Sequence, residues 1–416
     1  MSNLIDGFIG YLFSKTDSAG PEVYQKAADC VEDYRAVAAA GERKNERRWR
    51  AVLENSPGPA EVIGSGKTTD PKTAALINGF NAHTLELDDG QRFAMIHLGA
   101  AVISAIFSAA AGKAVSEKEI LRGVIAGYEA ACRTALCMQP AHKKRGFHTA
   151  GTCGTIGAAV GAAFATGCRP EQMKTVLSCA VGSAAGMLEL QEQSSELKPY
   201  NLGRAAMDGY TAAEMGTTGF ACPDDMLGGE RGFFKLFAGE FDERELTGDK
   251  PYFEIERIYV KPYASCRHSH SAIEAALKIG KSVDRSAIGS VSVRSYDLAV
   301  RGHDHQTVCG SASAKLSTPY AVAAALLYGR ADLSVFEPVD PGAAELAKRV
   351  SVTEDPRFTA LCPAMRAAEV TVYMKDGTEK TERVDYAKGE PENPMTKEEF
   401  SEKIAMLRAY AQSADR

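Results

Sequence analysis

Apolar and small residues recur at a helical spacing over most of the first half of the chain. Within residues 1–50 this pattern predicts two helices, and Gly20 followed by Pro21 marks the start of the second. From residue 71 to about residue 216 the pattern is almost wholly helical. The individual helices are expected at 98–111, 120–137, 151–166, 171–190 and 205–219. Their density of Ala and Gly predicts a tightly packed, all-helical core.

The pattern changes after Pro223. Short apolar runs and alternating apolar and polar positions replace the helical spacing, which predicts strands joined by turns and single helices. The expected elements are a short apolar element at 234–237, strands at 253–259, 288–296, 367–373 and 378–386, and helices at 271–281 and 396–411. The chain is therefore predicted to be mostly α. Its expected parts are an all-helical domain at 1–248, an α+β domain at 249–390 and a C-terminal segment, 391–416, that packs back on the first domain.

Composition places the chain among ordinary globular proteins. Its 416 residues are enough for two domains with ample cores, and 45% of them are hydrophobic while 25% are charged. The formal net charge is −6 and there is no long basic tract, so a nucleic-acid partner is not expected. An acidic protein binds anions through a local cluster of cations, so an anion site has to be sought in particular loops.

Cysteine usage and the N-terminal pattern favour a reducing, cytoplasmic setting. The ten cysteines form no CxxC pair, so neither a zinc ribbon nor a thioredoxin-like site is indicated. The N-terminal segment has an acid before its apolar run and no basic start, which is poor for a signal peptide. Residues 149–167 carry no charge, but they are mostly Gly, Ala and Thr and lack the transfer energy of a membrane span. No membrane partner is expected.

Two nucleotide-binding motifs are considered and rejected. Residues 64–68, Gly-Ser-Gly-Lys-Thr, resemble the end of a phosphate-binding loop, but Glu61 stands where that motif requires its first glycine. A GxGxxG motif does not follow any expected strand, so a Rossmann dinucleotide site is also unsupported.

The stretch 78–99 concentrates titratable groups. It begins as a close-packed helix and ends in a loop with two histidines and three acids: His83, His97, Glu86, Asp88 and Asp89. Acids and imidazoles gathered at the mouth of a loop are typical of proton transfer. A solvated helix end with a satisfied core histidine is the other explanation of the same residues.

Further candidates lie in polar loops expected at 142–148, 191–204 and 260–270, and at the start of a later helix. They are His148, Lys198, Arg204, Cys266, Arg267, His270 and Tyr320. Together they would form a pocket for a small di- or tricarboxylate, because Lys and Arg hold carboxylates while a histidine or an acid removes a proton from the carbon alpha to one of them. That carbon is a very weak acid, so the developing enediolate needs preorganised positive charge.

Two histidine pairs and one cysteine leave other chemistries open. His268 with His270, and His303 with His305, have a period-two spacing that would place both imidazoles of a pair on one strand face, where they would ligate zinc or iron. No HExxH motif or carboxylate triad accompanies them, so no metal is predicted, and His303 and His305 are expected in an exposed loop. Cys266 is a candidate nucleophile because cationic neighbours lower the pKa of a thiol, and a packed, unreactive thiol is the preferred explanation of the same residue.

At these positions the sequence resembles the MmgE/PrpD family. The shared motifs follow the family's order: ALINGFNAH (75–83), ELDD (86–89), HLG (97–99), GFH (146–148), KPYNLG (198–203), KPY (261–263) with His270, and AKLSTPYAVA (314–323). The family includes 2-methylcitrate dehydratase, cis-aconitate decarboxylase and iminodisuccinate epimerase. The resemblance implies a large all-helical domain plus a smaller α+β lid domain, a site between them, a homodimer and no cofactor.

The resemblance also implies roles for single residues. Glu86 stands where the family usually has Asp, and the residues that match active-site positions are His97, His148, Lys198, His270 and Tyr320, with Cys266 in a site-lining loop. Catalytic roles are therefore predicted for Glu86, His97, His148, Lys198 and Tyr320. Substrate binding is predicted for Asp89, Arg204, Cys266, Arg267 and His270.

The predicted activity is that of a cofactor-independent lyase that removes a proton alpha to a carboxylate of a small di- or tricarboxylate, in the manner of 2-methylcitrate dehydratase. A cis-aconitate decarboxylase-like lyase and an iminodisuccinate epimerase-like isomerase are the alternatives within the family. Glu86, Leu98 and Asn201 depart from the family's usual residues. These departures leave the substrate open and keep a non-catalytic carboxylate-binding protein as an alternative of another class.

Overall fold

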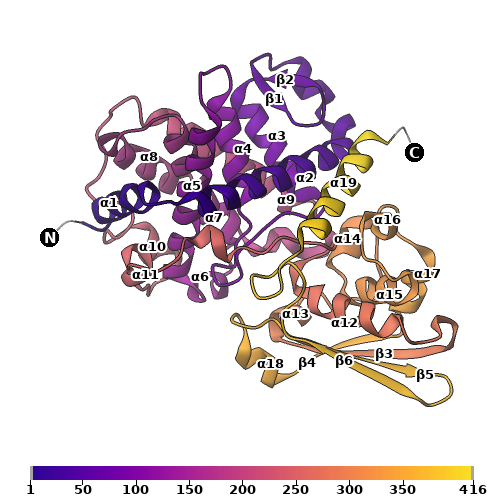
Figure 1. Ribbon diagram of the computed structural model, residues 1–416. Coiled ribbons are helices and arrows are strands. Elements are labelled where there is room, and N and C mark those ends of the chain that lie inside the picture. The colour runs from indigo at the N-terminus through magenta and orange to yellow at the C-terminus, as the bar shows by residue number, and fades with distance from the viewer. Residues whose placement is uncertain (1–2, 414–416) are drawn as a thin grey trace.

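The computed structural model describes residues 3–413 and, of residues 192–194, the backbone only. Residues 1–2 and 414–416, which belong to the predicted first domain and C-terminal segment, lie outside the described residues. The chain builds a large helical part and a smaller part that contains a four-stranded sheet (Figure 1). The prediction of a mostly α protein, with an all-helical domain plus a smaller α+β domain, is confirmed.

The helical part contains the elements α1 to α11. They are α1 (Leu4–Asp17), α2 (Pro21–Glu54), α3 (Pro71–Thr84), α4 (Gly99–Ala110), α5 (Glu117–Met138), α6 (Ala141–Lys144), α7 (Thr149–Ala165), α8 (Pro170–Ser183), η1 (Leu188–Ser194), α9 (Leu197–Met215), α10 (Phe233–Phe237) and α11 (Glu243–Thr247). The uncharged segment that begins at Thr149 is α7, which is buried along its whole length. Within residues 3–413, no helix combines the length and the apolar character needed to cross a membrane.

Glycines allow α5 and α7 to pack backbone against backbone. A Cβ atom on Gly157 would lie 2.6 Å from the carbonyl oxygen of Gly127 and 2.5 Å from the Cβ of Ala131. In the reverse direction, a Cβ atom on Gly127 would lie 2.8 Å from the carbonyl oxygen of Gly157. Real Cβ atoms do not approach other heavy atoms so closely, so only glycine permits this helix separation. The density of small residues in the sequence predicts this kind of packing.

Two helix boundaries differ most from the prediction. The helix expected at 171–190 ends at Ser183, because the backbone is extended from Ala184 and pairs with the segment before α7. In this pairing the His148 amide donates to the Gly186 carbonyl at 3.1 Å. The next helix begins at Leu197 instead of residue 205. Pro199 lies in its first turn, where the missing N–H costs no helical hydrogen bond. The predicted loop at 191–204 is therefore wrong over 197–204, which is helical.

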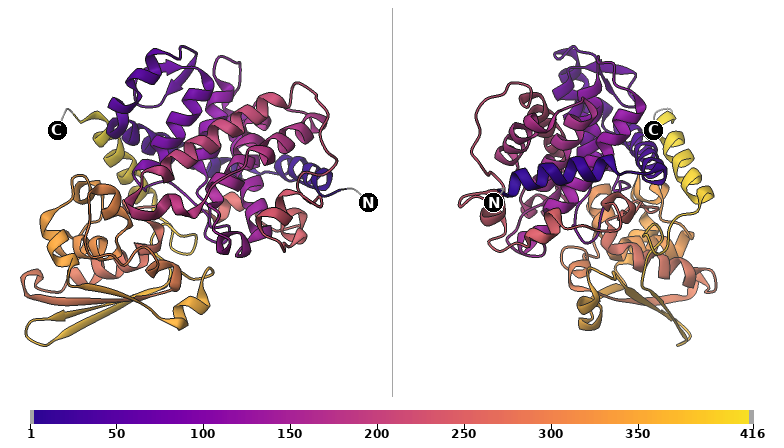
Figure 2. Two further views of the ribbon diagram at one scale, coloured as in Figure 1. Left: turned by 180° about the vertical axis from the view of Figure 1, so that it is seen from behind. Right: turned by 60° about the vertical axis from the view of Figure 1, so that its left-hand side comes forward.

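The smaller part is a four-stranded mixed sheet in the order β4-β3-β5-β6. Its strands are β3 (Ile288–Ser295), β4 (Val350–Glu354), β5 (Ala368–Met374) and β6 (Glu379–Val384), where β3 and β4 are parallel and the other neighbours are antiparallel. The helices α12 (His270–Gly280) and α15 (Thr318–Tyr328) pack against it, and the sheet forms the outer edge of the molecule (Figure 2). The remaining short elements are η3 (Arg267–Ser269), η4 (Arg285–Ala287), α13 (Asp297–Val300), α14 (Ser311–Leu316), α16 (Leu333–Phe336), α17 (Pro341–Ala347) and α18 (Pro356–Leu361).

Local pairing overturns one further expectation. The strand predicted at 253–259 is instead η2 (Glu254–Arg257), a 3₁₀ turn followed by a single bridge between Tyr259 and Gly90. That bridge consists of two hydrogen bonds of 2.8 and 3.2 Å, and it ties the segment leading into the smaller part to the loop after α3. The segment before α3 contains a small hairpin formed by β1 (Ala60–Val62) and β2 (Lys67–Thr69).

The C-terminal helix α19 (Lys397–Gln412) returns to the helical part and packs along α2 (Figures 1 and 2). Its Ile404 and Leu407 share one hydrophobic cluster with Val37 of α2 and with the core of the smaller part. The buried ammonium of Lys403 lies 2.5 Å from a carboxylate oxygen of Asp33 on α2. The last helix therefore connects both parts of the molecule.

Candidate active site

The loop after α3 gathers charged side chains in a buried cluster. His83, in the last turn of α3, has its Nδ1 2.7 Å from Oδ2 of Asp88 and its Nε2 3.3 Å from Oε1 of Glu86. Glu86 has a φ of +54°, a left-handed conformation that is uncommon outside glycine and that points to local constraint. Burial alone would lower the pKa of His83, but the carboxylates of Asp88 and Glu86 raise it above its ordinary value. The imidazole of His83 therefore favours its cationic form.

Two lysines from distant parts of the chain bind the same carboxylate. Lys198, in the first turn of α9, donates to Oε1 of Glu86, and Lys261, which follows the Tyr259 bridge, donates to Oε2 at 2.7 Å. Lys261 also lies 3.3 Å from Asp88. Burial alone would raise the pKa of Glu86, but the two ammonium groups hold it well below its ordinary value. Glu86 is therefore a charged counter-ion here and not a proton acceptor at neutral pH.

His97 lies beside His83 but has the opposite charge preference. The two imidazole ring centroids are 4.8 Å apart, and Nδ1 of His97 lies 3.0 Å from the carbonyl oxygen of Asp89 and 3.2 Å from Asp88. Burial lowers the pKa of His97 to about 4, with only partial compensation from Asp88. His97 is therefore a neutral imidazole next to one whose protonated form the carboxylates favour, an arrangement that separates a base from an acid.

Asp89 holds the backbone of the same loop. Its Oδ1 accepts a hydrogen bond from the amide of Gly99 at the start of α4 at 2.9 Å, and its Oδ2 accepts one from the hydroxyl of Tyr128 at 2.5 Å. Burial raises the pKa of Asp89 to about 6. Both carboxylate oxygens are used by the protein, so the structure places Asp89 as a support for the start of α4 and for His97.

His148 precedes α7 and is oriented by α9. Its Nδ1 lies 2.7 Å from Oδ1 of Asn201, whose amide nitrogen donates to the carbonyl of Ala185 and thereby fixes the orientation of the amide group. Nδ1 therefore donates its proton to Asn201, and Nε2 holds the lone pair. Burial lowers the pKa of His148 to about 3, with Lys198 among the groups that oppose its protonation. A neutral imidazole with an unprotonated Nε2 is in the form that accepts a proton.

Arg267 and His270 form a network with each other at the beginning of α12. A guanidinium nitrogen of Arg267 lies 2.8 Å from Glu390 and another lies 2.8 Å from Nδ1 of His270. Nε2 of His270 donates to the carbonyl of Ser265 at 3.0 Å. Both ring nitrogens of His270 are therefore used internally. The expected strand face shared by His268 and His270 is also wrong, because these residues lie in η3 and α12 and have different partners.

Cys266 lies in the segment between Lys261 and α12, and its backbone amide donates to the carbonyl of Lys315 at 2.8 Å. The Sγ atom is 3.7 Å from Nε2 of His303. His303 is only 9% exposed, so its expected place in an exposed loop is wrong. The fold buries this imidazole because Nδ1 finds a partner in the carbonyl of Leu316 at 2.8 Å.

Two predicted site residues are not brought into the cluster. The guanidinium of Arg204 pairs with Asp208 one turn further along α9 and donates to the carbonyl groups of Ser183 and Ala185. It therefore fastens α9 to the segment after α8. The hydroxyl of Tyr320 is buried in the smaller part, where it bonds to the backbone of Val335 and Asp340. The contacts of both residues are those of structural groups.

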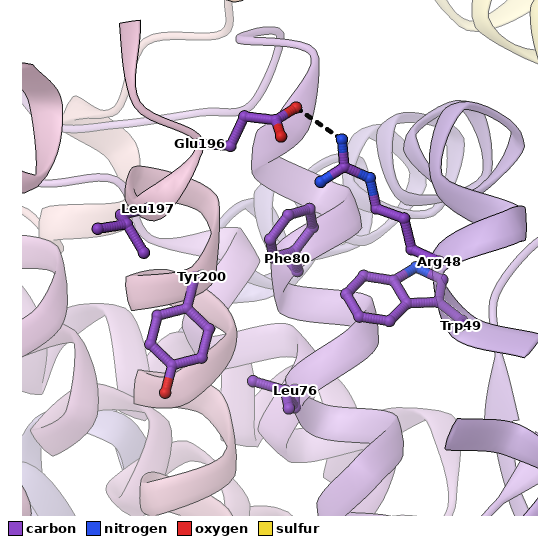
Figure 3. A pocket seen from close by; sticks show the side chains of 7 residues that line it. All are labelled: Arg48, Trp49, Leu76, Phe80, Glu196, Leu197 and Tyr200. Atoms are coloured by element: carbon purple, nitrogen blue, oxygen red, sulfur yellow. Dashed lines mark hydrogen bonds and ion pairs between the residues drawn. The ribbon is translucent and has the colours of Figure 1, made fainter. Parts of the chain in front are cut away.

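The helix α9 faces two different environments. Leu197 and Tyr200 line an apolar pocket together with Leu76, Phe80 and Trp49, and an ion pair between Arg48 and Glu196 crosses its rim at 2.8 Å (Figure 3). Lys198 and Asn201, on the same helix, are buried and reach Glu86 and His148. The pocket offers apolar surface, whereas the buried cluster holds the acid–base groups.

Sequence reasoning left Lys261, His83, Asp88, Asn201 and His303 out of the predicted site. Lys261 is the basic residue of the motif Lys-Pro-Tyr (261–263), and that motif is the sequence feature from which it could have been predicted as a site residue. His83 and Asp88 lie in the stretch that concentrates titratable groups. For Asn201 and His303 the sequence gives no signal of comparable strength, because their roles depend on contacts across 53 and 37 positions of the chain.

Among the side chains that the structure describes, two groups have a geometry that suits a metal ion. One group is His83 with Asp88 and His97, and the other is Cys266 with His268 and His303. Within each group the ligand atoms lie within 4.8 Å of one another. In the first group the ammonium of Lys261 contacts Asp88 at 3.3 Å and already neutralises the carboxylate. Positive charge so close to the ligands opposes a divalent cation.

The two-part fold and its buried cluster correspond to one known class of protein. Residues 13–245 match the family model of the MmgE/PrpD N-terminal domain and residues 263–416 match that of the MmgE/PrpD C-terminal domain. The chain belongs to the MmgE/PrpD family, as its motifs predicted.

Curated relatives cover nearly the whole chain. The protein is 26% identical to a cis-aconitate decarboxylase of Aspergillus terreus over 433 aligned positions, which cover 94% of this chain and 86% of the relative. It is 25% identical to a cis-aconitate decarboxylase-like protein of Aspergillus oryzae, with 95% and 88% covered. With a cis-aconitate decarboxylase of Homo sapiens the identity is 24%, with 80% and 72% covered.

Proposed function

We propose that this protein is a lyase that acts on a small tricarboxylate by proton transfer at the carbon alpha to a carboxylate, without a cofactor. The main support is the convergence of Lys198 and Lys261 on the single carboxylate of Glu86. Two buried ammonium groups at one point make a site for negative charge. The names of the relatives, cis-aconitate decarboxylases, support a tricarboxylate as the substrate.

The ammonium groups of the lysines have further N–H donors for a substrate. An ammonium group has three N–H donors, and Lys198 uses one of them on Glu86. The others are available to a substrate carboxylate that enters beside Glu86. When the adjacent carbon loses a proton, negative charge spreads over that carboxylate, and the same ammonium group stabilises it more strongly than it stabilises the ground state.

His148 is the proposed base of this step. Its Nδ1–H is held by Asn201, so the unprotonated Nε2 can take a proton from carbon and later return it. His97, also neutral, and His83, whose protonated form the carboxylates favour, provide a second base and an acid within the same cluster. Dehydration, decarboxylation and epimerisation share a carbanion-like intermediate at this carbon. The relatives' names make decarboxylation the first reaction to test.

The test is a screen of small acids in deuterium oxide with EDTA present. Incubation with cis-aconitate, citrate, 2-methylcitrate and iminodisuccinate, followed by proton NMR and carbon dioxide detection, is expected to show turnover or deuterium incorporation with at least one tricarboxylate. His148→Ala is expected to lower the rate by about a hundredfold or more. His142→Gln is the matched control, because His142 is also buried but bonds to Thr152.

The absence of both turnover and exchange across the whole panel would contradict the proposal. A dicarboxylate that raises the melting temperature without any exchange would instead favour the non-catalytic carboxylate-binding protein. If His142→Gln lowers the rate as much as His148→Ala, the effect of His148 belongs to stability and not to chemistry.

A further inference from the structure

Cys266 and His303 form a close pair that the proposed mechanism has not used. The Sγ atom of Cys266 lies 3.7 Å from Nε2 of His303, and both side chains are buried, at 8% and 9% exposure. Cys266 comes from the segment that also holds Lys261, and His303 comes from the loop after α13. The two side chains are therefore held together by separate elements of the smaller part.

The backbone of α14 fixes the geometry of this pair. Nδ1 of His303 donates to the carbonyl of Leu316 at 2.8 Å, so Nε2 is the ring nitrogen that faces the sulfur. The amide of Cys266 donates to the carbonyl of Lys315, the preceding residue on α14. A histidine whose second nitrogen is anchored in this way is oriented for acid–base work with its partner.

The charges around the pair favour a thiolate next to an imidazolium. Burial alone would raise the pKa of the Cys266 thiol, but His303 and Lys198 lower it to about 6. Burial would lower the pKa of His303, but the sulfur raises it above its ordinary value. The charged and titratable groups that face the thiol come from several elements: His303, His268, Lys198, Lys261, Lys143, Glu86 and Tyr296.

Lys198 connects this pair to the proposed site. Its ammonium bonds to Glu86, and its positive charge lowers the pKa of both His148 and Cys266. A substrate carboxylate held by Lys198 would therefore be bound at a charge that acts on both groups. Enzymes that move a proton at carbon gain from two acid–base groups around one such carbon.

We propose that Cys266 and His303 form a thiolate–imidazolium pair that acts as a further proton-transfer group of this site, in addition to His148. The inference rests on the proposed function. In this step the C–H bond alpha to a carboxylate breaks and the proton forms an S–H bond with Sγ. The electron pair passes into the carboxylate as an enediolate, whose charge lies beside Lys198. The S–H group returns a proton to carbon in the reverse direction.

A metal ion at the same place is the competing explanation. The ligand atoms of Cys266, His268 and His303 lie within 4.8 Å of one another, which suits a thiophilic metal. However, burial lowers the pKa of His268 well below its ordinary value, and the cations Arg366, Lys143 and Lys198 lower it further. These cations oppose a divalent metal in the same way, whereas they favour a thiolate and a bound carboxylate.

The first test follows alkylation of each cysteine by iodoacetamide from about pH 5 to pH 9, with peptide mass spectrometry as the readout. The rate at Cys266 is expected to rise through about pH 6 and then to stay level, whereas an ordinary thiol still gains rate near its pKa of about 8.5. His303→Gln is expected to move the midpoint upward by at least about one pH unit. Exposed Cys309 and fully buried Cys132 are the internal references.

Three outcomes would overturn the assignment. One is alkylation of Cys266 only above about pH 8, or no alkylation at all in the folded protein, because the step needs a thiolate that small molecules can reach. Another is an unchanged midpoint in His303→Gln. The third is stoichiometric zinc in the purified protein that is lost in Cys266→Ser, because a coordinated thiolate is not free to accept a proton.

The second test separates this inference from the proposed function. Cys266→Ser is expected to lower turnover by about a hundredfold and to remove the decline of kcat/KM on the acidic side of about pH 6. The control Cys309→Ser, at an exposed cysteine, is expected to keep the wild-type turnover and pH profile. A Cys266→Ser protein with the wild-type rate and pH profile would overturn the inference and leave the proposed function intact. Absence of turnover in the wild type would remove the proposed function, and with it the role of the pair.

Discussion

At the scale of single residues, burial and one or two neighbours decide the charge of each group in the cluster. His83 and His97 have ring centroids only 4.8 Å apart, yet carboxylates raise the pKa of the first while burial lowers that of the second to about 4. Neighbouring imidazoles with opposite preferences supply an acid and a base within one small volume. The central anion among them is Glu86.

Replacing Glu86 by Gln removes the negative charge between two buried ammonium groups. Burial alone would raise the pKa of Glu86, but Lys198 and Lys261 hold it well below 4.5. A depressed pKa stabilises the folded protein above about pH 4.5, and this stabilisation is lost as the pH falls through the folded-state value. Glu86→Gln is therefore expected to lower the melting temperature at neutral pH and to flatten its decline below about pH 5.

The measurement is thermal unfolding of both proteins across that pH range. Glu230→Gln is the control, because Glu230 forms an exposed ion pair with Lys235 that contributes little to stability. Equal melting temperatures of Glu86→Gln and the wild type at neutral pH would show that Glu86 does not hold the two lysines.

At the scale of elements, small residues set how closely the helices approach. Gly157→Ala places a Cβ atom 2.5 Å from Cβ of Ala131 and 2.6 Å from the carbonyl of Gly127, so α5 and α7 must separate. The expected loss is about 1–3 kcal/mol of unfolding free energy, measured by chemical denaturation. Gly154→Ala is the matched control on the same helix, since its Cβ would meet only Ala101 at 3.6 Å. A Gly157→Ala protein as stable as Gly154→Ala would contradict this packing.

The sequence predicted most elements because their patterns are local. The alternating strand expected at 288–296 depends on residues a few positions apart, and it lies at Ile288–Ser295. The start of α9 and the 3₁₀ turn η2 could not be predicted in this way. The chain before α9 is diverted by pairing with the segment around His148, and η2 precedes a bridge to Gly90, more than 160 positions away in the sequence.

The candidate site was predictable only in part for the same reason. The family motifs pointed to His97, His148, Lys198 and Glu86, which the fold brings toward one cluster. The same motifs contain Tyr320, whose hydroxyl instead bonds to the backbone of the smaller part. A motif gives the identity of a residue, whereas the direction of its side chain depends on contacts between elements far apart in the chain.

At the scale of the whole molecule, α19 connects the two parts next to the cluster. Lys403 is 2.5 Å from Asp33 on α2 and donates to the carbonyl of Leu87 at 2.8 Å, which lies between Glu86 and Asp88 in the chain. Lys403→Met leaves Asp33 as an unpaired buried charge, with an expected cost of about 3 kcal/mol or more of unfolding free energy. The displaced loop is also expected to lower turnover.

Denaturant unfolding and a steady-state assay check this prediction together. Arg408→Met is the control on the same helix, because the exposed pair of Arg408 with Glu32 contributes at most about 1 kcal/mol. A Lys403→Met protein that matches Arg408→Met in stability and rate would show that α19 does not support the site.

The most direct measurement is the rate of deuterium incorporation from solvent into the carbon alpha to a carboxylate, compared between Lys198→Met and Lys235→Met. Lys198 lies buried against Glu86, whereas Lys235 forms an exposed pair with Glu230. The account predicts a loss of at least about a hundredfold in Lys198→Met and a wild-type rate in Lys235→Met. A folded Lys198→Met protein that exchanges at the wild-type rate would contradict it.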